Sequence, residues 1–238
     1  MLLPSYGGID YVGGKTFARV SGATYGATQA YGGSRSLKIV TSSTDAFEAS
    51  AALGLGSNVT LGLVVVPGTL GTTVSLFGIG NSASLPSRNR TGLRIGSTGL
   101  AEAYAIGVTG TTGAAASSVA PTVGRPNVIV GLFSGTTSRR VALNGAISAA
   151  ETTSATATGI NTTSIGSMAG SSRLSGQVGD YLLAVAWSRV LSDVEVLEFS
   201  RNPWQIFGLR VGRRLTPNGA AAAAWYHFSM IGQSRVGG

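Results

Sequence analysis

Short apolar stretches separated by glycine-rich turns run along almost the whole chain and leave little room for helices. Examples are SRSLKIV (34–40), NVTLGLVVVP (58–67) and RPNVIVGLFS (125–134), which are bounded by Gly, Pro, Asn or Ser. Asn144 and Gly145 form the strongest short-range hairpin signal, because both residues tolerate positive φ. This spacing predicts about ten to twelve strands in a two-layered antiparallel sandwich or jelly roll. The expected fold class is therefore all-β.

One passage departs from this pattern: LSDVEVLEFSRNPW (191–204) reads as a short helix. Ser192 is a good N-cap, and Glu195 three positions later completes a capping box. Pro203 cannot continue a helix. We therefore predict one short capped helix over about 192–201. We expect it to pack on the edge of the sandwich through Val194, Leu197 and Phe199.

The charge of the chain indicates which classes of partner it could bind. The formal net charge is +8, and arginine carries almost all of the positive charge. A nucleic-acid-binding face needs basic residues gathered together, ideally with aromatic residues between them. These arginines are dispersed, so we expect a solvated or protein-facing surface and no nucleic-acid partner. Arginine is favoured at protein interfaces as well as on phosphates.

Several protein classes are excluded by what the sequence lacks. The chain has no cysteine, which excludes disulfides and thiolate metal sites. Apolar stretches such as YLLAVAW (181–187) fall far short of the roughly 20 residues that span a bilayer. The start, MLLPSYGGID (1–10), has neither the basic segment nor the apolar core of a signal peptide. We expect a soluble protein without membrane insertion.

The composition changes after Phe207, where basic residues, five consecutive alanines and several aromatic residues follow one another. We therefore predict one domain over 1–207 and a C-terminal arm over 208–238. The arm is too apolar for a purely solvated tail, so we expect it to contact another subunit or a neighbouring protein. The residues expected to make this contact are Arg210, Arg213, Arg214, Trp225, Tyr226, Phe228 and Met230.

Four stretches in the second half of the chain resemble a known family. They are RRVALNGAISAAETTS (139–154), TTSIGSMAG (162–170), LSGQVGDYLLAVAWSRVLSDVEV (174–196) and NPWQIF (202–207). Together they are similar to the laminin-G-like branch of the concanavalin A-like lectin/glucanase superfamily. The resemblance implies a two-sheet antiparallel jelly roll that is closed by the short helix.

The NPWQIF ending is further similar to lectin-like domains in the structural modules of tailed phages and prophages. That similarity implies a non-enzymatic virion structural protein, either a capsid decoration or a fibre component. Such a protein would be made in the host cytoplasm and located on the particle surface. It would attach through its termini to other capsid or tail proteins and would associate with itself.

Catalytic and metal chemistry have little support in the residues. Glycoside hydrolases need a pair of closely spaced carboxylates, and no predicted strand carries two at alternate positions. We therefore expect no enzyme, and a glycoside hydrolase is the least favoured function. Asp10, Asp45 and Glu48 could meet in a calcium site, but solvated turn acids are the favoured interpretation. We expect no cofactor.

Sugar binding is the function that the superfamily resemblance adds as the alternative. Lectin sites use aromatic faces with polar groups from loops, and Tyr25 and Tyr31 lie in a glycine-rich stretch that could present them. The competing interpretation is that these tyrosines pack on the rim of the sheet. Two functions therefore remain open: a virion structural protein, and a glycan-binding adhesin module of a tail fibre that recognises cell-surface glycans.

Overall fold

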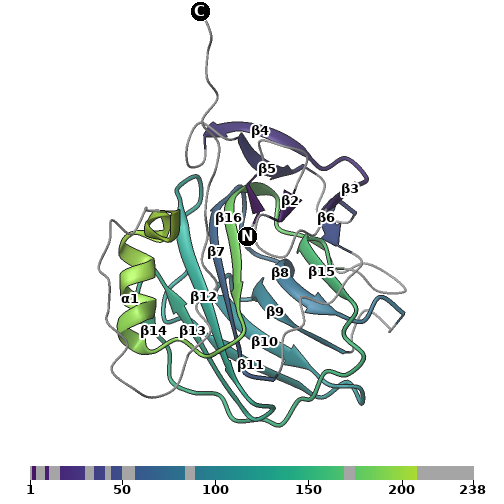
Figure 1. Cartoon of the computed structure of the whole chain (residues 1–238), viewed down its shortest axis with the longest axis vertical. Helices are drawn as coiled ribbons and strands as arrows, with labels where there is room; N and C mark the ends of the chain where they lie inside the picture. The colour runs from purple at the N-terminus through teal and green to yellow at the C-terminus, as the bar shows by residue number, and fades with distance from the viewer. Residues whose placement is uncertain are drawn as a thin grey trace, which may run out of the picture.

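Two antiparallel β-sheets packed face to face form the body of the protein (Figure 1). The computed structural model describes residues 2–3, 9–10, 17–29, 35–40, 44–49, 57–83, 89–168 and 175–207. Over these described residues, one sheet, which we call sheet A, has nine strands, and the other, sheet B, has seven. Neighbouring strands in both sheets are antiparallel. The predicted all-β jelly-roll sandwich with one short helix is confirmed.

The strand order brings distant parts of the chain side by side in each sheet. Sheet A runs β14-β13-β12-β7-β16-β1-β2, with β5 also beside β16 and β4 beside β5. Its strands are β1 (Leu2–Leu3), β2 (Ile9–Asp10), β4 (Thr24–Gln29), β5 (Arg35–Ile39), β7 (Val59–Pro67), β12 (Asn127–Ser134), β13 (Ser138–Leu143), β14 (Ala146–Ile147) and β16 (Gly179–Trp187). Sheet B runs β11-β10-β9-β8-β15-β6-β3. Its strands are β3 (Ala18–Val20), β6 (Ala46–Ala49), β8 (Val74–Gly80), β9 (Arg90–Ile95), β10 (Ala101–Ile106), β11 (Thr112–Ala116) and β15 (Thr162–Gly166).

The main core lies between the two sheets. On β7, the alternate residues Leu61, Leu63 and Val65 are fully buried and belong to this interlayer core. Leu93 and Ile95 on β9 face them from sheet B. The β7 residues that alternate with Leu61, Leu63 and Val65 are buried as well, because a helix covers the outer face of sheet A. Burial on both faces explains why β7 reads as a continuous apolar run rather than an alternating one.

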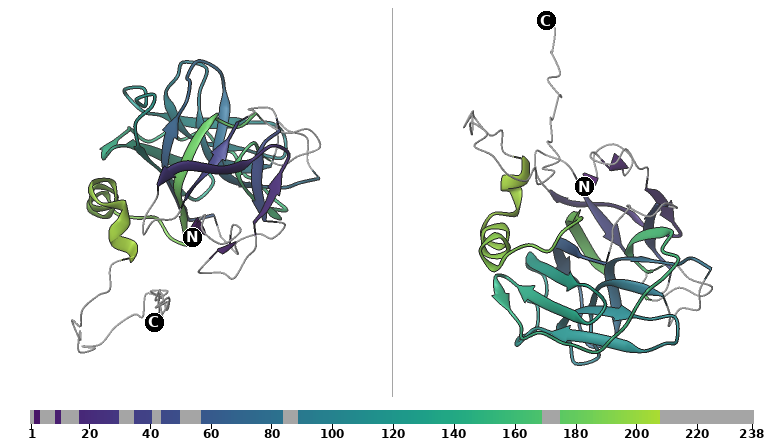
Figure 2. Two further views of the ribbon diagram at one scale, coloured as in Figure 1. Left: turned by 90° about the horizontal axis from the view of Figure 1, so that it is seen from above. Right: turned by 60° about the horizontal axis from the view of Figure 1, so that its bottom comes forward.

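That helix, α1 (Asp193–Arg201), stands beside the outer face of sheet A (Figures 1 and 2). The predicted capping box is confirmed, since Ser192 accepts from the backbone N–H of Glu195 and the Glu195 carboxylate accepts from that of Ser192. Leu191 and Val196 both belong to the cluster beneath the helix. Their positions before and after the cap match a hydrophobic staple, which fixes the angle at which the chain enters the helix.

The predicted packing face of the helix is partly wrong. Val194 is 67% exposed, whereas Val196 and Phe199 are buried. Leu197 is half-buried. The ring of Phe199 meets Trp187 at the end of β16 edge to face, with centroids 5.2 Å apart. Residues spaced three apart share one helix face, so burying Val196 with Phe199 turns Val194 toward solvent.

The chain after α1 continues as the short 3₁₀ helix η3 (Pro203–Phe207). Trp204 and Ile206 pack against the same cluster as Val196 and Phe199, so this segment is fastened to sheet A. The arm predicted from residue 208 onward lies outside the described residues. Its separation from the domain over 1–207 stays a prediction. No helix in the described part of the chain has the length and apolarity to cross a membrane.

Candidate functional site

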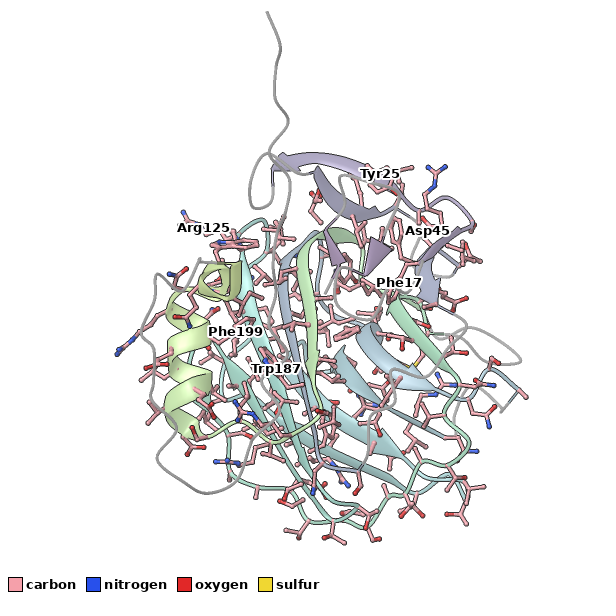
Figure 3. The ribbon with its side chains drawn as sticks, in the orientation of Figure 1. Phe17, Tyr25, Asp45, Arg125, Trp187 and Phe199 are labelled. Atoms are coloured by element: carbon pink, nitrogen blue, oxygen red, sulfur yellow. The ribbon has the colours of Figure 1, made fainter. Side chains whose placement is uncertain are left out.

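Tyr25 lies half-exposed on β4, at the end of the sandwich that also carries Phe17 and Asp45 (Figure 3). Its ring packs against Phe47 of β6, with centroids 6.0 Å apart and planes tilted by 44°. The guanidinium carbon of Arg19 lies over the Tyr25 ring, 5.7 Å from its centroid. Arg19 comes from β3 in sheet B and Tyr25 from sheet A, so the pair is assembled where the chain crosses between the sheets. Arg19 is exposed and Tyr25 is half-exposed.

We call this surface the Tyr25 rim, defined by Arg19, Ser21, Tyr25 and Thr44. Ser21 turns the chain between β3 and β4 with a φ of 56°, and its hydroxyl lies 3.0 Å from that of Thr44. Arginine over an aromatic face is held by cation–π attraction as well as by dispersion. The rim therefore combines a pre-positioned guanidinium, a phenol ring and two hydroxyls on one surface.

Asp45 fixes the backbone that carries the Tyr25 rim. Its buried carboxylate accepts from the backbone N–H of Gly22 at 2.9 Å and from that of Val40 at 3.1 Å. It thereby ties the β3–β4 turn to the end of β5. Gly22 leaves the space for this, because a Cβ there would lie 3.2 Å from the Asp45 carboxylate. Asp45 is thus a structural acid and not a solvated turn residue.

The calcium site considered from the sequence has no support in this arrangement. Glu48 lies on the other side of β6 from Phe47 and accepts from the Ser164 hydroxyl at 3.1 Å. The side chain of Asp10 lies outside the described residues. Among the described residues, no group of three or more His, Cys, Asp or Glu side chains could hold a metal ion.

Of the two tyrosines predicted for glycan binding, the structure describes Tyr25. Its ring packs on the sheet rim and is also partly exposed, and its role in glycan binding stays a prediction. Tyr31 lies outside the described residues. The same holds for the seven arm residues predicted for partner binding, which are Arg210, Arg213, Arg214, Trp225, Tyr226, Phe228 and Met230.

A second group, formed by Arg94, Glu102 and Tyr104 on the outer face of sheet B, was not brought together from the sequence. Arg94 Nε lies 2.5 Å from a carboxylate oxygen of Glu102, and its guanidinium carbon lies 4.7 Å from the centroid of the Tyr104 ring. Tyr104 is fully buried, and this burial raises the pKa of its hydroxyl. Arg94 and Glu102 are opposite each other in the β9–β10 register. The glycines at 96 and 99 are the signal that could have revealed this hairpin.

No family model matches the chain, and no curated protein matches its sequence. Solved structures do match its fold. The carbohydrate-binding module CBM40 of the Ruminococcus gnavus IT-sialidase, bound to α2,3-sialyllactose, matches at 16% identity with a TM-score of 0.57, over 69% of this chain and 96% of that one. The binding domain of botulinum neurotoxin serotype G matches at 13% identity with a TM-score of 0.60, over 84% of this chain.

A heptameric SAP-like pentraxin from Limulus polyphemus matches at 13% identity with a TM-score of 0.53, over 76% of this chain and 81% of that one. Our chain spans 50% of the length of the neurotoxin binding domain. At such identities the likeness shows a common jelly-roll fold. The neighbours named here are binding domains and a pentraxin. The laminin-G-like and phage-specific parts of the resemblance stay predictions.

Proposed function

We propose that this protein is a non-enzymatic glycan-binding module and that the Tyr25 rim is its binding surface. The observation that carries the proposal is the exposed Arg19, whose guanidinium lies over the partly buried ring of Tyr25. The CBM40 structure with the same fold is bound to α2,3-sialyllactose, an acidic sugar. Guanidinium groups match carboxylates in both charge and geometry. We therefore assign an acidic glycan as the ligand class.

The remaining carboxylates support a binding role over a catalytic one. Glu102, Glu151 and Glu195 each pair with an arginine, and Asp180 accepts from the Ser36 hydroxyl at 2.7 Å. Retaining glycosidases need two carboxyls about 5–5.5 Å apart that face the substrate. Acids used in ion pairs and in hydrogen bonds between strands serve the fold, so we propose no hydrolytic activity.

The test measures α2,3-sialyllactose binding by calorimetry, with lactose as the neutral comparison. We expect the wild-type protein to bind the acidic sugar more tightly. The substitution Arg19→Ala should weaken binding by about tenfold or more, because a charge-assisted hydrogen bond is lost. Arg125→Ala is the matched control, since Arg125 is an exposed arginine far from Tyr25 (Figure 3). Equal losses in both variants would indicate non-specific charge attraction, and absence of binding to any acidic glycan would reject the proposal.

A second proposed function is the virion structural role. It rests on the similarity of the NPWQIF segment to phage structural modules. Under this proposal the protein sits on the phage particle, held to neighbouring virion proteins and to copies of itself. A fibre adhesin would combine both functions.

Removal of residues 208–238 separates the two proposals. The truncated protein should fail to enter particles if the arm attaches it, while its affinity for sialyllactose should be unchanged. Incorporation is measured by immunoblotting of purified particles. Normal incorporation of the truncated protein would contradict attachment through the arm.

A further inference from the structure

One edge of sheet B is formed by β11, whose sequence is TGAAA. The strand follows β8, β9 and β10 toward the lower end of Figure 1, and over the described residues no further strand lies beyond it. Open sheet edges can pair with another chain, and proteins usually prevent this with charged side chains, prolines or bulges. β11 contains no charged residue and no proline, and its pairing with β10 is regular. Its edge therefore lacks the usual protection against pairing.

The backbone of β11 carries hydrogen-bonding groups that point along this edge. In an antiparallel pair, every second residue bonds to the neighbouring strand. The N–H of Ser117, just beyond β11, donates to the carbonyl of Ala101 at 2.8 Å, which sets the alternation. Thr112, Ala114 and Ala116 therefore direct their N–H and C=O groups away from β10. Among the described residues, no backbone hydrogen bond uses these groups.

The side chains along the edge are small and uncharged. Thr112 and Ala116 are exposed, and Ala114 is half-buried. In the sequence, no charged residue occurs between Glu102 and Arg125. The chain has a net charge of +8, so two copies repel each other least where uncharged strands meet. An acidic peptide would find no basic side chain on β11, and the edge therefore suits a second copy of this chain.

Exposed valines lie at both ends of β11. Val108, in the turn before the strand, is 51% exposed, and Val119, which follows the strand, is 59% exposed. A twofold axis at Ala114 pairs Thr112 of one copy with Ala116 of the other, so that outward-facing backbone groups meet each other. The same axis brings the Val108 end of each copy beside the Val119 end of the other. Each exposed valine thus gains an apolar neighbour.

We propose that β11 pairs with β11 of a second copy, antiparallel about a twofold axis at Ala114. Sheet B of one copy then continues into sheet B of the other. A twofold contact of this kind is closed, so it uses up the open edges of both copies. Arg19 lies on β3, at the opposite edge of sheet B, so the dimer leaves the Tyr25 rim of each copy accessible. The inference rests neither on that rim nor on the arm over 208–238.

Two double variants of the full chain test the pairing and its register. In the dimer, residue 112 of each copy faces residue 116 of the other, whereas within one strand the two positions are about 13 Å apart. Thr112→Lys with Ala116→Lys places lysine opposite lysine twice. Thr112→Glu with Ala116→Lys places glutamate opposite lysine twice. Both positions are exposed, and the two variants share the change at 116, so they are matched for their effect on folding.

Sedimentation velocity over a range of concentrations measures the dimer, and circular dichroism compares the folding of the variants. We expect wild type to dimerise and the double-lysine variant to raise the dissociation constant about tenfold or more. The glutamate–lysine variant should restore most of the affinity. A wild-type protein that stays monomeric overturns the proposal and leaves the edge to a strand of another protein. Unchanged dimerisation of the double-lysine variant would assign the contact to another surface, and equal losses in both variants would exclude this register.

Discussion

Arg189 holds the carboxylate of Glu195 through two hydrogen bonds, Nη1 to Oε2 at 2.9 Å and Nη2 to Oε1 at 2.6 Å. The same carboxylate accepts from the backbone N–H of Ser192 at 2.8 Å and so caps α1. One acidic side chain therefore joins the end of sheet A to the start of the helix. These hydrogen bonds, led by that from Arg189, lower the pKa of Glu195 to about 2.

This pair predicts an acid-dependent stability. Because folding lowers the pKa of Glu195, its stabilisation is complete above the ordinary value of 4.5 and is lost as the pH falls through about 2. Both side chains are partly exposed, so we expect Glu195→Gln to lower the free energy of unfolding by about 1 kcal/mol at pH 7. The difference in the free energy of unfolding between wild type and variant should decrease steadily below pH 5. Urea unfolding between pH 7 and pH 3 measures it.

Glu198 on the exposed side of the same helix is the matched control. Glu198→Gln removes the same charge without removing the two hydrogen bonds from Arg189, so its unfolding curve should follow that of wild type at every pH. If the difference in unfolding free energy between wild type and Glu195→Gln stays constant down to pH 3, the carboxylate is not the stabilising group.

Features of the fold that depend on contacts between neighbouring residues could be predicted from the sequence. Features that depend on residues far apart in the chain could not. Ser192, Glu195 and Pro203 act on their own neighbours, so the limits of the helix were predictable. Which face is buried depends on distant residues: Val196 and Phe199 face Trp187, which no local pattern reveals. Val194 was therefore assigned to the wrong side.

The same limit applies to the candidate sites. Tyr25 was predictable as an aromatic residue in a glycine-rich stretch, but its partner Arg19 belongs to the other sheet. Arg139 was expected on the surface with the other arginines, whereas its alternation with Val141 and Leu143 turns its charge toward the core. The conflict is resolved by Glu151, which reaches back from the connection after β14.

The corrected helix face gives a second prediction. Phe199→Ala removes a buried ring that contacts Trp187, and should lower the free energy of unfolding by about 3–5 kcal/mol. Val194→Ala changes an exposed side chain and should alter it by less than about 0.5 kcal/mol. Chemical denaturation at pH 7 compares the two. Similar losses would mean that the helix packs through both faces.

A third prediction concerns the space that Gly113 leaves for the buried ion pair. The added methyl of Gly113→Ala would collide with Arg139 and Glu151, and overpacking of this kind costs about 1–3 kcal/mol. Gly80→Ala is the control, because a Cβ there meets its nearest atom at an ordinary 3.5 Å. In thermal unfolding, the melting temperature of Gly113→Ala should be clearly lower than that of Gly80→Ala. An unaffected Gly113→Ala would show that the ion pair has room to move.

The β13–β14 turn gives the last prediction, because Asn144 contributes there in two separable ways. Its backbone has a φ of 51°, and its side-chain carbonyl accepts from the partly buried N–H of Val128 at 2.8 Å. Asn144→Gly keeps the backbone freedom but loses the hydrogen bond, and should lower the free energy of unfolding by about 1–2 kcal/mol. Asn144→Ala loses both, and should lower it by roughly 1 kcal/mol more, because alanine resists positive φ. Urea denaturation of the three proteins tests this order. If the glycine variant matched wild type, the side-chain hydrogen bond would contribute nothing; if alanine matched glycine, the turn would not require a left-handed residue.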